Sequence, residues 1–201
     1  MTDPPRFSSW DQRYQNRPVE TMPWFYPDLD PDLAQALDRL GISSGKALDL
    51  DTGPGTQAIA LAKRGFDVTA TDLSSAAIAS AERRAAAEGV QVRFLQNDIL
   101  ASQIEETFDV VFDRGCFHMI DPEHRAAYAQ RVHGLVELLG HLFLKTLSVK
   151  QPGTQGPHRL APKDIASVFG SRFDLMSITE TAYQGMLDPP PLALFCVLRR
   201  R

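Results

Sequence analysis

A glycine-rich turn and an aspartate that follows it give the chain its first chemical signal. Gly53 and Gly55 come after the apolar segment 47–50, and Asp72 stands 19 residues beyond Gly53. Glycines at a helix start let a ligand approach backbone N–H groups, where the helix dipole favours negative charge. A carboxylate about 20 residues further on can accept both hydroxyl groups of a ribose. The spacing predicts a nucleoside site; a tight strand-to-helix connection and a helix-flanking aspartate are the alternatives.

Two polar residues follow the next expected strand, at residues 91–96. Asn97 and Asp98 stand where that strand ends, beside the end of the strand that carries Asp72. A carboxylate there can accept a hydrogen bond from an adenine amino group, with Ile99 against the ring. A turn-forming Asn-Asp pair explains the same residues without a ligand, so both interpretations stay open.

An alternation of short apolar segments and helical segments must position these residues. Asp30 and Ser74 are typical helix caps, and Asp121 is expected to cap a helix that runs to about Leu139. Strands linked by helices imply βαβ crossovers and a parallel sheet covered on both faces. The expected strands lie at 47–50, 68–71, 91–96, 108–112 and 141–147, and the expected helices at 31–40, 56–64, 75–88, 122–139 and 162–169.

The end of the chain breaks this alternation. Segments 173–181 and 192–198 both have strand character, and only a loop containing Pro189–Pro191 joins them. That loop is too short for a crossover helix, so the two strands should pair antiparallel. The expected fold class is α/β, a doubly wound Rossmann-like sheet of seven strands in which five parallel strands precede a C-terminal antiparallel hairpin.

The first 29 residues differ from the rest in being rich in proline and aromatic side chains. We expect residues 1–29 to form an N-terminal arm, carrying Trp10, Tyr14 and Trp24, that lies on a main domain of residues 30–201.

Composition excludes several classes of protein. The 201 residues carry a net charge of −4, without the basic footprint of a nucleic-acid or membrane-surface binder. No apolar run approaches the ~20 residues of a membrane span. Cys116 and Cys196 lack the spacing of a metal or redox motif, and the N-terminus does not resemble a signal peptide. We expect a cytoplasmic protein without a metal, monomeric or weakly self-associating.

The motifs resemble those of class I S-adenosylmethionine (SAM) dependent methyltransferases. The segment Asp49–Gly55 is similar to that family's acidic-x-Gly-x-Gly-x-Gly loop, and the likeness continues through Asp72, Asp98 and Phe108–Asp113 to the terminal hairpin. Trp10–Tyr14 with Pro23-Trp24, and Phe112–His118, resemble the thiopurine S-methyltransferase and tellurite-resistance branch. In that branch an N-terminal aromatic arm folds over the cofactor.

The resemblance implies SAM as the cofactor and a small molecule as the methyl acceptor. Asp49 would lie near the methionyl ammonium, with Gly53 and Gly55 under the methionine part. Further roles fall to Asp72 and Leu73 at the ribose, Asn97, Asp98 and Ile99 at the adenine, Trp10 and Trp24 as aromatic cover, and Asp113 and Arg114 beside the sulfonium.

Asp51 departs from the family pattern, because it stands where the family has its first glycine. Its charge would repel the methionyl carboxylate, or, if it points elsewhere, it would bind the methionyl ammonium. Aspartate tolerates unusual backbone angles better than most residues, so the turn itself can survive.

Methyl transfer needs alignment, a dry pocket and an electron-rich nucleophile. His118 is the candidate base or acceptor-orienting residue, with a structural histidine as the alternative; thiol, selenol, tellurium and thiopurine acceptors need no strong base. Lys145 and Arg159 are expected at the rim of the site. Residues 152–157 would form a lid, under which Arg159 and Arg114 would hold an anionic group of the acceptor.

Two other functions fit part of the pattern. The turn Gly53–Ala58 with Asp72 also matches a dinucleotide fingerprint, which would indicate a nicotinamide oxidoreductase. The second alternative is a binding subunit. In that case Asp51 would weaken SAM binding, and the chain would keep the fold without the activity.

Overall fold

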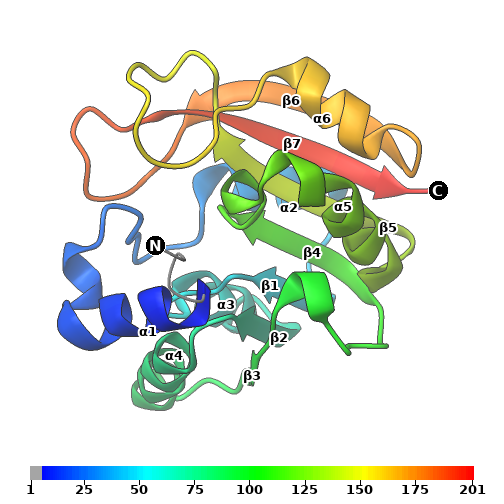
Figure 1. Ribbon diagram of the computed structural model, residues 1–201. Helices are drawn as coiled ribbons and strands as arrows, with labels where there is room; N and C mark the ends of the chain where they lie inside the picture. Colours follow the sequence, from blue (N-terminus) through cyan, green and yellow to red (C-terminus); the bar gives the residue numbers. More distant parts are fainter. Residues whose placement is uncertain (1–5) are drawn as a thin grey trace.

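A seven-stranded sheet forms the centre of the molecule, which we describe from a computed structural model covering residues 6–201 (Figure 1). The strand order is β3-β2-β1-β4-β5-β7-β6. The first five strands pair in parallel and β6 and β7 join antiparallel, so the predicted fold class is confirmed. The strands are β1 Gly45–Leu50, β2 Phe66–Asp72, β3 Arg93–Gln96, β4 Phe108–Arg114, β5 Val136–Leu147, β6 Phe173–Ala182 and β7 Leu192–Arg200.

Helices cover both faces of this sheet. On one face α2 and α3 pack through Leu37 and Leu61 against a core that includes Phe112. On the other, α5 and α6 bury Tyr128 and Phe169. Apolar side chains of the parallel strands therefore point into a core on either side, as in doubly wound folds. The helices are α1 Arg6–Asn16, α2 Pro31–Leu40, α3 Thr56–Lys63, α4 Ser75–Ala87, α5 Arg125–Leu135 and α6 Pro162–Phe169, with short 3-10 turns at Val19–Thr21, Ile99–Ala101, Phe117–Met119 and Pro122–His124.

Two predicted helix caps are confirmed and a third is wrong. The carboxylate of Asp30 accepts from the Asp32 N–H, and the Ser74 hydroxyl accepts from the Ala77 N–H. Asp121 forms no side-chain cap and precedes a 3-10 turn. The helix expected to reach Leu139 ends at Leu135, because Val136 is fully buried and starts β5 opposite Phe108. Burial of an apolar strand residue here overrides the helical preference of the leucines after it.

The segment before α2 lies against the main domain, as Figure 1 shows for α1 beside α4. Val19, Met22 and Phe25 form a small buried cluster of their own. The carboxylate of Asp11 accepts hydrogen bonds from the Ser74 hydroxyl (2.5 Å) and the Ala76 N–H (3.1 Å). These bonds fix α1 to the N-terminus of α4, and the second one satisfies an N–H group that the helix itself leaves without a partner. In the described part of the chain, no helix has the length and apolar character that crossing a bilayer requires.

Candidate functional site

A cavity of about 400 Å³ opens at the carboxyl ends of the parallel strands. We call it the central cavity. Its walls come from the segment before α2, the end of β4, the loop after β5 and the β6–β7 loop (residues 183–191). Its lining residues are Trp10, Arg13, Tyr14, Pro23, Trp24, Asp51, Asp72, Arg114, Gly115, His118, Met119, Leu147, Gly156, Pro157, Tyr183, Leu187 and Pro191.

A smaller recess of about 30 Å³ adjoins the central cavity and shares Trp10, Asp51, Asp72 and Met119 with it. We call it the side recess. Its other walls come from the ends of β1, β2 and β3 and from the loops after them, and they bring together polar residues that lie far apart in the sequence. The additional lining residues are Leu50, Thr71, Leu73, Asn97, Asp98, Ile99 and Cys116.

The turn after β1 carries three residues with left-handed backbone: Asp51 at φ 58°, Gly53 at φ 54° and Gly55 at φ 80°. A side chain on Gly53 would meet the Tyr14 hydroxyl, so this glycine lets the backbone approach the arm and the cavity. Gly55 has a different reason. A side chain there would collide with Ala81 of α4, so Gly55 serves the packing of the helices behind the turn.

Asp72 lies at the carboxyl end of β2 and lines both the cavity and the recess. Its two carboxylate oxygens accept the N–H groups of Gly53 and Ser74, both at 2.8 Å. Burial raises the pKa of Asp72 to about 6, against the opposing effect of these two hydrogen bonds. A carboxylate has further lone pairs after accepting two bonds, so Asp72 can still accept hydrogen bonds from a ligand.

One residue that lines the side recess, Asn97, carries an unsatisfied polar atom. The amide nitrogen of Asn97 is buried and forms no hydrogen bond to any of the described residues. Asp98 instead caps the 3-10 turn after it, with its carboxylate accepting from the Leu100 N–H at 2.9 Å. A buried donor without a partner costs about 1–3 kcal/mol, and a ligand acceptor in the recess would remove that cost.

Asp49 and Asp113 do not line the cavity or the recess. Asp49 lies beneath the glycine turn, where it accepts from the Thr52 hydroxyl at 2.5 Å and burial raises its pKa to about 7. The Asp113 carboxylate accepts the N–H groups of Gly115, Cys116 and Phe117 at 2.7–2.9 Å, and also the Tyr128 hydroxyl. These bonds hold the loop after β4 in place. The Asp113 carboxylate is therefore engaged by its own loop and by Tyr128, and its place beside the sulfonium stays a prediction.

His118 does face the central cavity, and its hydrogen bonding fixes its tautomer. The Leu147 N–H donates to its Nδ1 at 3.1 Å, so the ring proton of the neutral histidine is on Nε2. The side chain is 6% exposed, and burial, helped by His158 and Arg114, lowers its pKa to about 3. The ring therefore presents an N–H donor and has no lone pair left to act as a base.

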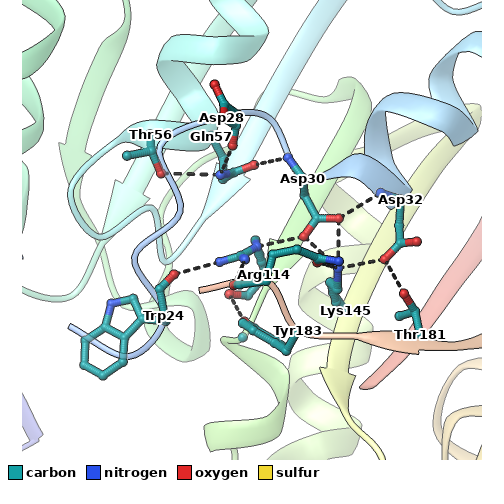
Figure 2. Close-up of polar contacts among 12 residues, drawn as sticks. Trp24, Asp28, Asp30, Asp32, Thr56, Gln57, Arg114, Lys145, Thr181 and Tyr183 are labelled. Atoms are coloured by element: carbon teal, nitrogen blue, oxygen red, sulfur yellow. Dashed lines mark hydrogen bonds and ion pairs between the residues drawn. The ribbon is translucent and has the colours of Figure 1, made fainter. Parts of the chain in front are cut away.

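Arg114 and Lys145 form a largely buried polar cluster with Asp30 and Asp32, which Figure 2 shows, and with Gln184; we call it the Asp30 cluster. Arg114 donates to Asp30 (2.9 Å) and to the backbone carbonyls of Trp24 (3.0 Å) and Gln184 (2.5 Å). Lys145 is fully buried rather than at the rim as expected. Burial raises the pKa of Asp30, but Lys145 and Arg114 outweigh it and hold that pKa below its usual value.

The loop after β5 places two of its residues, Gly156 and Pro157, at the cavity wall. Arg159 was expected to hold an anionic group there. Its guanidinium instead donates to the carbonyls of Gln151, Pro152 and Gln155, so it stabilises the loop from within.

Three aromatic residues of the arm line the central cavity, and Trp10 also reaches the side recess. The rings of Trp10 and Trp24 meet edge to face at 5.8 Å, and the Arg13 guanidinium lies over both at 5.3 and 5.7 Å. Burial, and repulsion from Asp72 and Asp51, raise the pKa of Tyr14 well above its ordinary value. The arm thus contributes aromatic faces and a neutral hydroxyl.

Sequence reasoning missed several site residues. Tyr183, Leu187 and Pro191 line the cavity from the β6–β7 loop, and no motif marks them. Asp30 was predicted only as a helix cap, although its carboxylate also binds two buried cations. The one available signal was a lysine inside the predicted apolar strand 141–147, since a buried lysine needs a partner.

A second hollow, of about 480 Å³, lies at the opposite edge of the sheet, where β1, β4 and β5 begin. Asp67, Asp109, Glu137 and Lys46 surround it. It contains none of the predicted site residues and lies away from the helix N-termini, where such folds bind ligands.

Comparisons with known proteins identify the family of the chain. The sequence profile of the family described as Thiopurine S-methyltransferase (TPMT) matches residues 6–189. The Ubiquinone biosynthesis O-methyltransferase of Pseudomonas fluorescens is 30% identical over 130 residues, covering 56% of this chain and 53% of the relative. Thiocyanate methyltransferase 1 of Brassica oleracea is 25% identical over 166 residues, covering 80% and 73%. The chain spans just over half the length of the first of these relatives.

Solved structures share the fold at low identity. A structure described as "Conversion of a Disulfide Bond into a Thioacetal Group during Echinomycin Biosynthesis" superposes with a TM-score of 0.84 at 24% identity, covering 96% of this chain and 92% of that one. TehB from Haemophilus influenzae has a TM-score of 0.74 at 16% identity, covering 96% and 67%.

Proposed function

Because the chain belongs to the thiopurine S-methyltransferase family, a family of SAM-dependent methyltransferases, we propose that it transfers a methyl group from SAM to a small-molecule acceptor. The observation that carries the proposal is the central cavity with its side recess, where Asp72, the glycine turn and the aromatic arm meet. Family membership favours this function over the nicotinamide oxidoreductase that the glycine spacing also allows.

The residues of the cavity and the recess fit such a cofactor. The unpartnered amide of Asn97 suits an adenine nitrogen, and Leu73, Asp98 and Ile99 complete that recess. Asp72 has acceptor capacity left for the ribose hydroxyls. Bound there, SAM supplies a methyl group on a positively charged sulfur.

The methionyl end would lie along the glycine turn at Gly53 and Asp51, with Asp49 acting from beneath the turn. Trp10 and Trp24 would cover the ligand from the arm side, since an aromatic face stabilises a nearby cation and a closed wall excludes water. In this proposal residues 1–29 form the arm, of which residues 1–5 lie outside the described part of the chain, and residues 30–201 form the domain that it covers.

With Asp51 and Asp72 assigned to the cofactor, none of the other described residues that line the cavity offers a free base. His118 presents an N–H donor, Tyr183 donates its hydroxyl proton to the Arg114 carbonyl at 2.6 Å, and the oxygens of Asp113 are held by N–H and O–H groups. An acceptor must therefore arrive ionised or ionise by itself. This favours a thiol, a selenol or a similar soft anion, in keeping with the relatives named thiocyanate methyltransferase.

Release of S-adenosylhomocysteine from SAM with a matched pair of acceptors tests the proposal. An aromatic thiol and the phenol of the same shape are compared at pH 7.5. A phenol with a pKa of about 10 is less than about 1% ionised there, whereas an aromatic thiol is more acidic than an alkyl thiol of pKa about 8.5 and is largely ionised. We expect the thiol to be methylated with loss of its proton to solvent, and the phenol to be inert. Comparable rates for the two would contradict the absence of a base.

Calorimetry with S-adenosylhomocysteine is the accompanying control. No detectable binding would favour the alternative in which Asp51 prevents SAM binding and the chain is a binding subunit without activity. A cytoplasmic location and a monomeric or weakly associating state are also part of this proposal, and size-exclusion chromatography tests the second.

A further inference from the structure

Two walls of the central cavity come from segments far apart in the chain. Pro23 and Trp24 belong to the arm, whereas Tyr183, Leu187 and Pro191 belong to the β6–β7 loop. Neither segment is part of the sheet. What holds them against the strand ends therefore decides the shape of the site.

The Arg114 guanidinium binds both segments at once, and Figure 2 shows its bond to the Trp24 carbonyl. One terminal nitrogen donates to the Trp24 carbonyl at 3.0 Å and the other to the Gln184 carbonyl at 2.5 Å, while Nε donates to Asp30 at 2.9 Å. The same group lies 4.7 Å from the ring centre of Tyr183. The Arg114 side chain is only 7% exposed, so water cannot easily replace these bonds.

Lys145 fixes the position of Asp30 and of the loop from the β5 side. Its Nζ donates to Asp30 at 2.8 and 3.0 Å, to Asp32 at 2.7 Å and to the Gln184 side chain at 2.6 Å. Two cations thus face two carboxylates in the Asp30 cluster. Removal of one partner would leave a buried charge uncompensated, which is strongly destabilising, so the cluster opposes separation of its parts.

The arm and the loop also touch each other directly. The Met186 N–H donates to the Pro23 carbonyl at 3.0 Å. The next residue back, Gly185, packs so closely on the same carbonyl that an added methyl group would overlap it. Movement of either segment alone would break this contact as well as the bonds to Arg114.

We propose that Arg114 is a positioning residue that makes the arm and the β6–β7 loop open and close over the cavity as one unit. The planar guanidinium presents several donors in a fixed fork, and each terminal nitrogen holds a different segment. A lysine keeps the charge opposite Asp30 but cannot span both carbonyls. The inference rests on the proposed function only in taking the central cavity as the reaction site.

Hydrogen exchange of the full chain without ligand, followed by mass spectrometry, tests this coupling. We expect Arg114→Lys to raise exchange on the order of tenfold in both 20–30 and 183–191, with β1 and β2 unchanged. Arg159→Lys is the matched control, because that arginine also binds backbone carbonyls, and its effect should stay within 151–157. A rise in only one of the two segments, or in neither, would overturn the proposal.

If Arg114→Lys destabilises the whole sheet, the coupling can still be tested by a measurement on the wild-type protein. Under native-state exchange in low denaturant, the Phe25, Tyr183 and Met186 amides, all hydrogen-bonded in the structure, should open with one shared denaturant slope and free energy. Distinct values for the arm and the loop would overturn the coupling.

Dissociation of S-adenosylhomocysteine from Arg114→Lys adds a functional readout. We expect its rate constant to rise about tenfold, with the association rate constant changed much less. An unchanged dissociation rate constant would mean that the coupled segments do not cover the ligand. Since the exchange experiments contain no ligand, their outcome is independent of the proposed function.

Discussion

Asp51 offers the sharpest test of how the cofactor end of the site works. It has left-handed backbone at φ 58°, is exposed, and lines both the central cavity and the side recess. Asp51→Gly removes the charge and the backbone strain, whereas Asp51→Asn removes only the charge, because asparagine also tolerates this conformation. The two substitutions together separate the two effects.

The charge effect follows from distance and screening. Two charges ~4 Å apart interact by about 1 kcal/mol in water and about 4 kcal/mol near a protein surface. Because Asp51 is exposed, the lower value applies, and removal of the repulsion should tighten binding of a ligand carboxylate about fivefold. The backbone effect is small in net terms. Glycine relieves about 1 kcal/mol of left-handed strain but costs about 0.5–1 kcal/mol of extra unfolded-chain entropy.

Calorimetry with two ligands measures the effect. S-adenosylhomocysteine carries the amino-acid group, and methylthioadenosine is the matched ligand without it. We expect both Asp51 variants to bind the first about fivefold more tightly and the second unchanged, with the melting temperature within a few degrees of wild type. A loss of tenfold or more for S-adenosylhomocysteine alone would refute the reasoning and identify Asp51 as a ligand of the ammonium group.

Three further substitutions test other parts of the site. Gly53→Ala should weaken S-adenosylhomocysteine binding tenfold or more in calorimetry, since the backbone is left-handed and the methyl would meet the Tyr14 hydroxyl; unchanged affinity would exclude a close approach at this turn. Asp49 has a folded-state pKa of about 7, above its unfolded value of 3.8. As pH rises from about 4 to 7, the unfolding free energy of wild type should therefore fall by on the order of 1–4 kcal/mol relative to that of Asp49→Asn. A constant difference between the denaturation curves of the two proteins over that range would contradict this. His118→Gln keeps a donor at the Nε2 position, so kcat/KM for a thiol should stay within about threefold of wild type, with the same pH profile from 5 to 8. If the rise of kcat/KM with pH seen in wild type disappeared in the variant, His118 would be a base.

The Asp30 cluster shows where sequence reasoning stops. Asp30 is separated from Arg114 by 84 residues and from Lys145 by 115, and no spacing rule links residues so far apart. The same limit explains Asp113. Its position at the end of β4 was correctly predicted, but the direction of its carboxylate depends on the loop that folds back over it.

From residue 30 onward, the sequence by itself determined the order of strands and helices along the chain, the antiparallel hairpin, the left-handed turn and the place of Asp72; the helix α1 was not predicted. These features depend on local periodicity, on glycine and capping chemistry and on loop length, all of which act between near neighbours in the chain. Only the tertiary structure decided which polar groups face the cavity and which are consumed in holding its walls. Gly55 packs against α4, Lys145 is buried with Asp30, and His118 gives up its free lone pair to Leu147. Such outcomes depend on contacts between distant segments, because a buried polar side chain turns toward whatever partner the completed fold brings within reach.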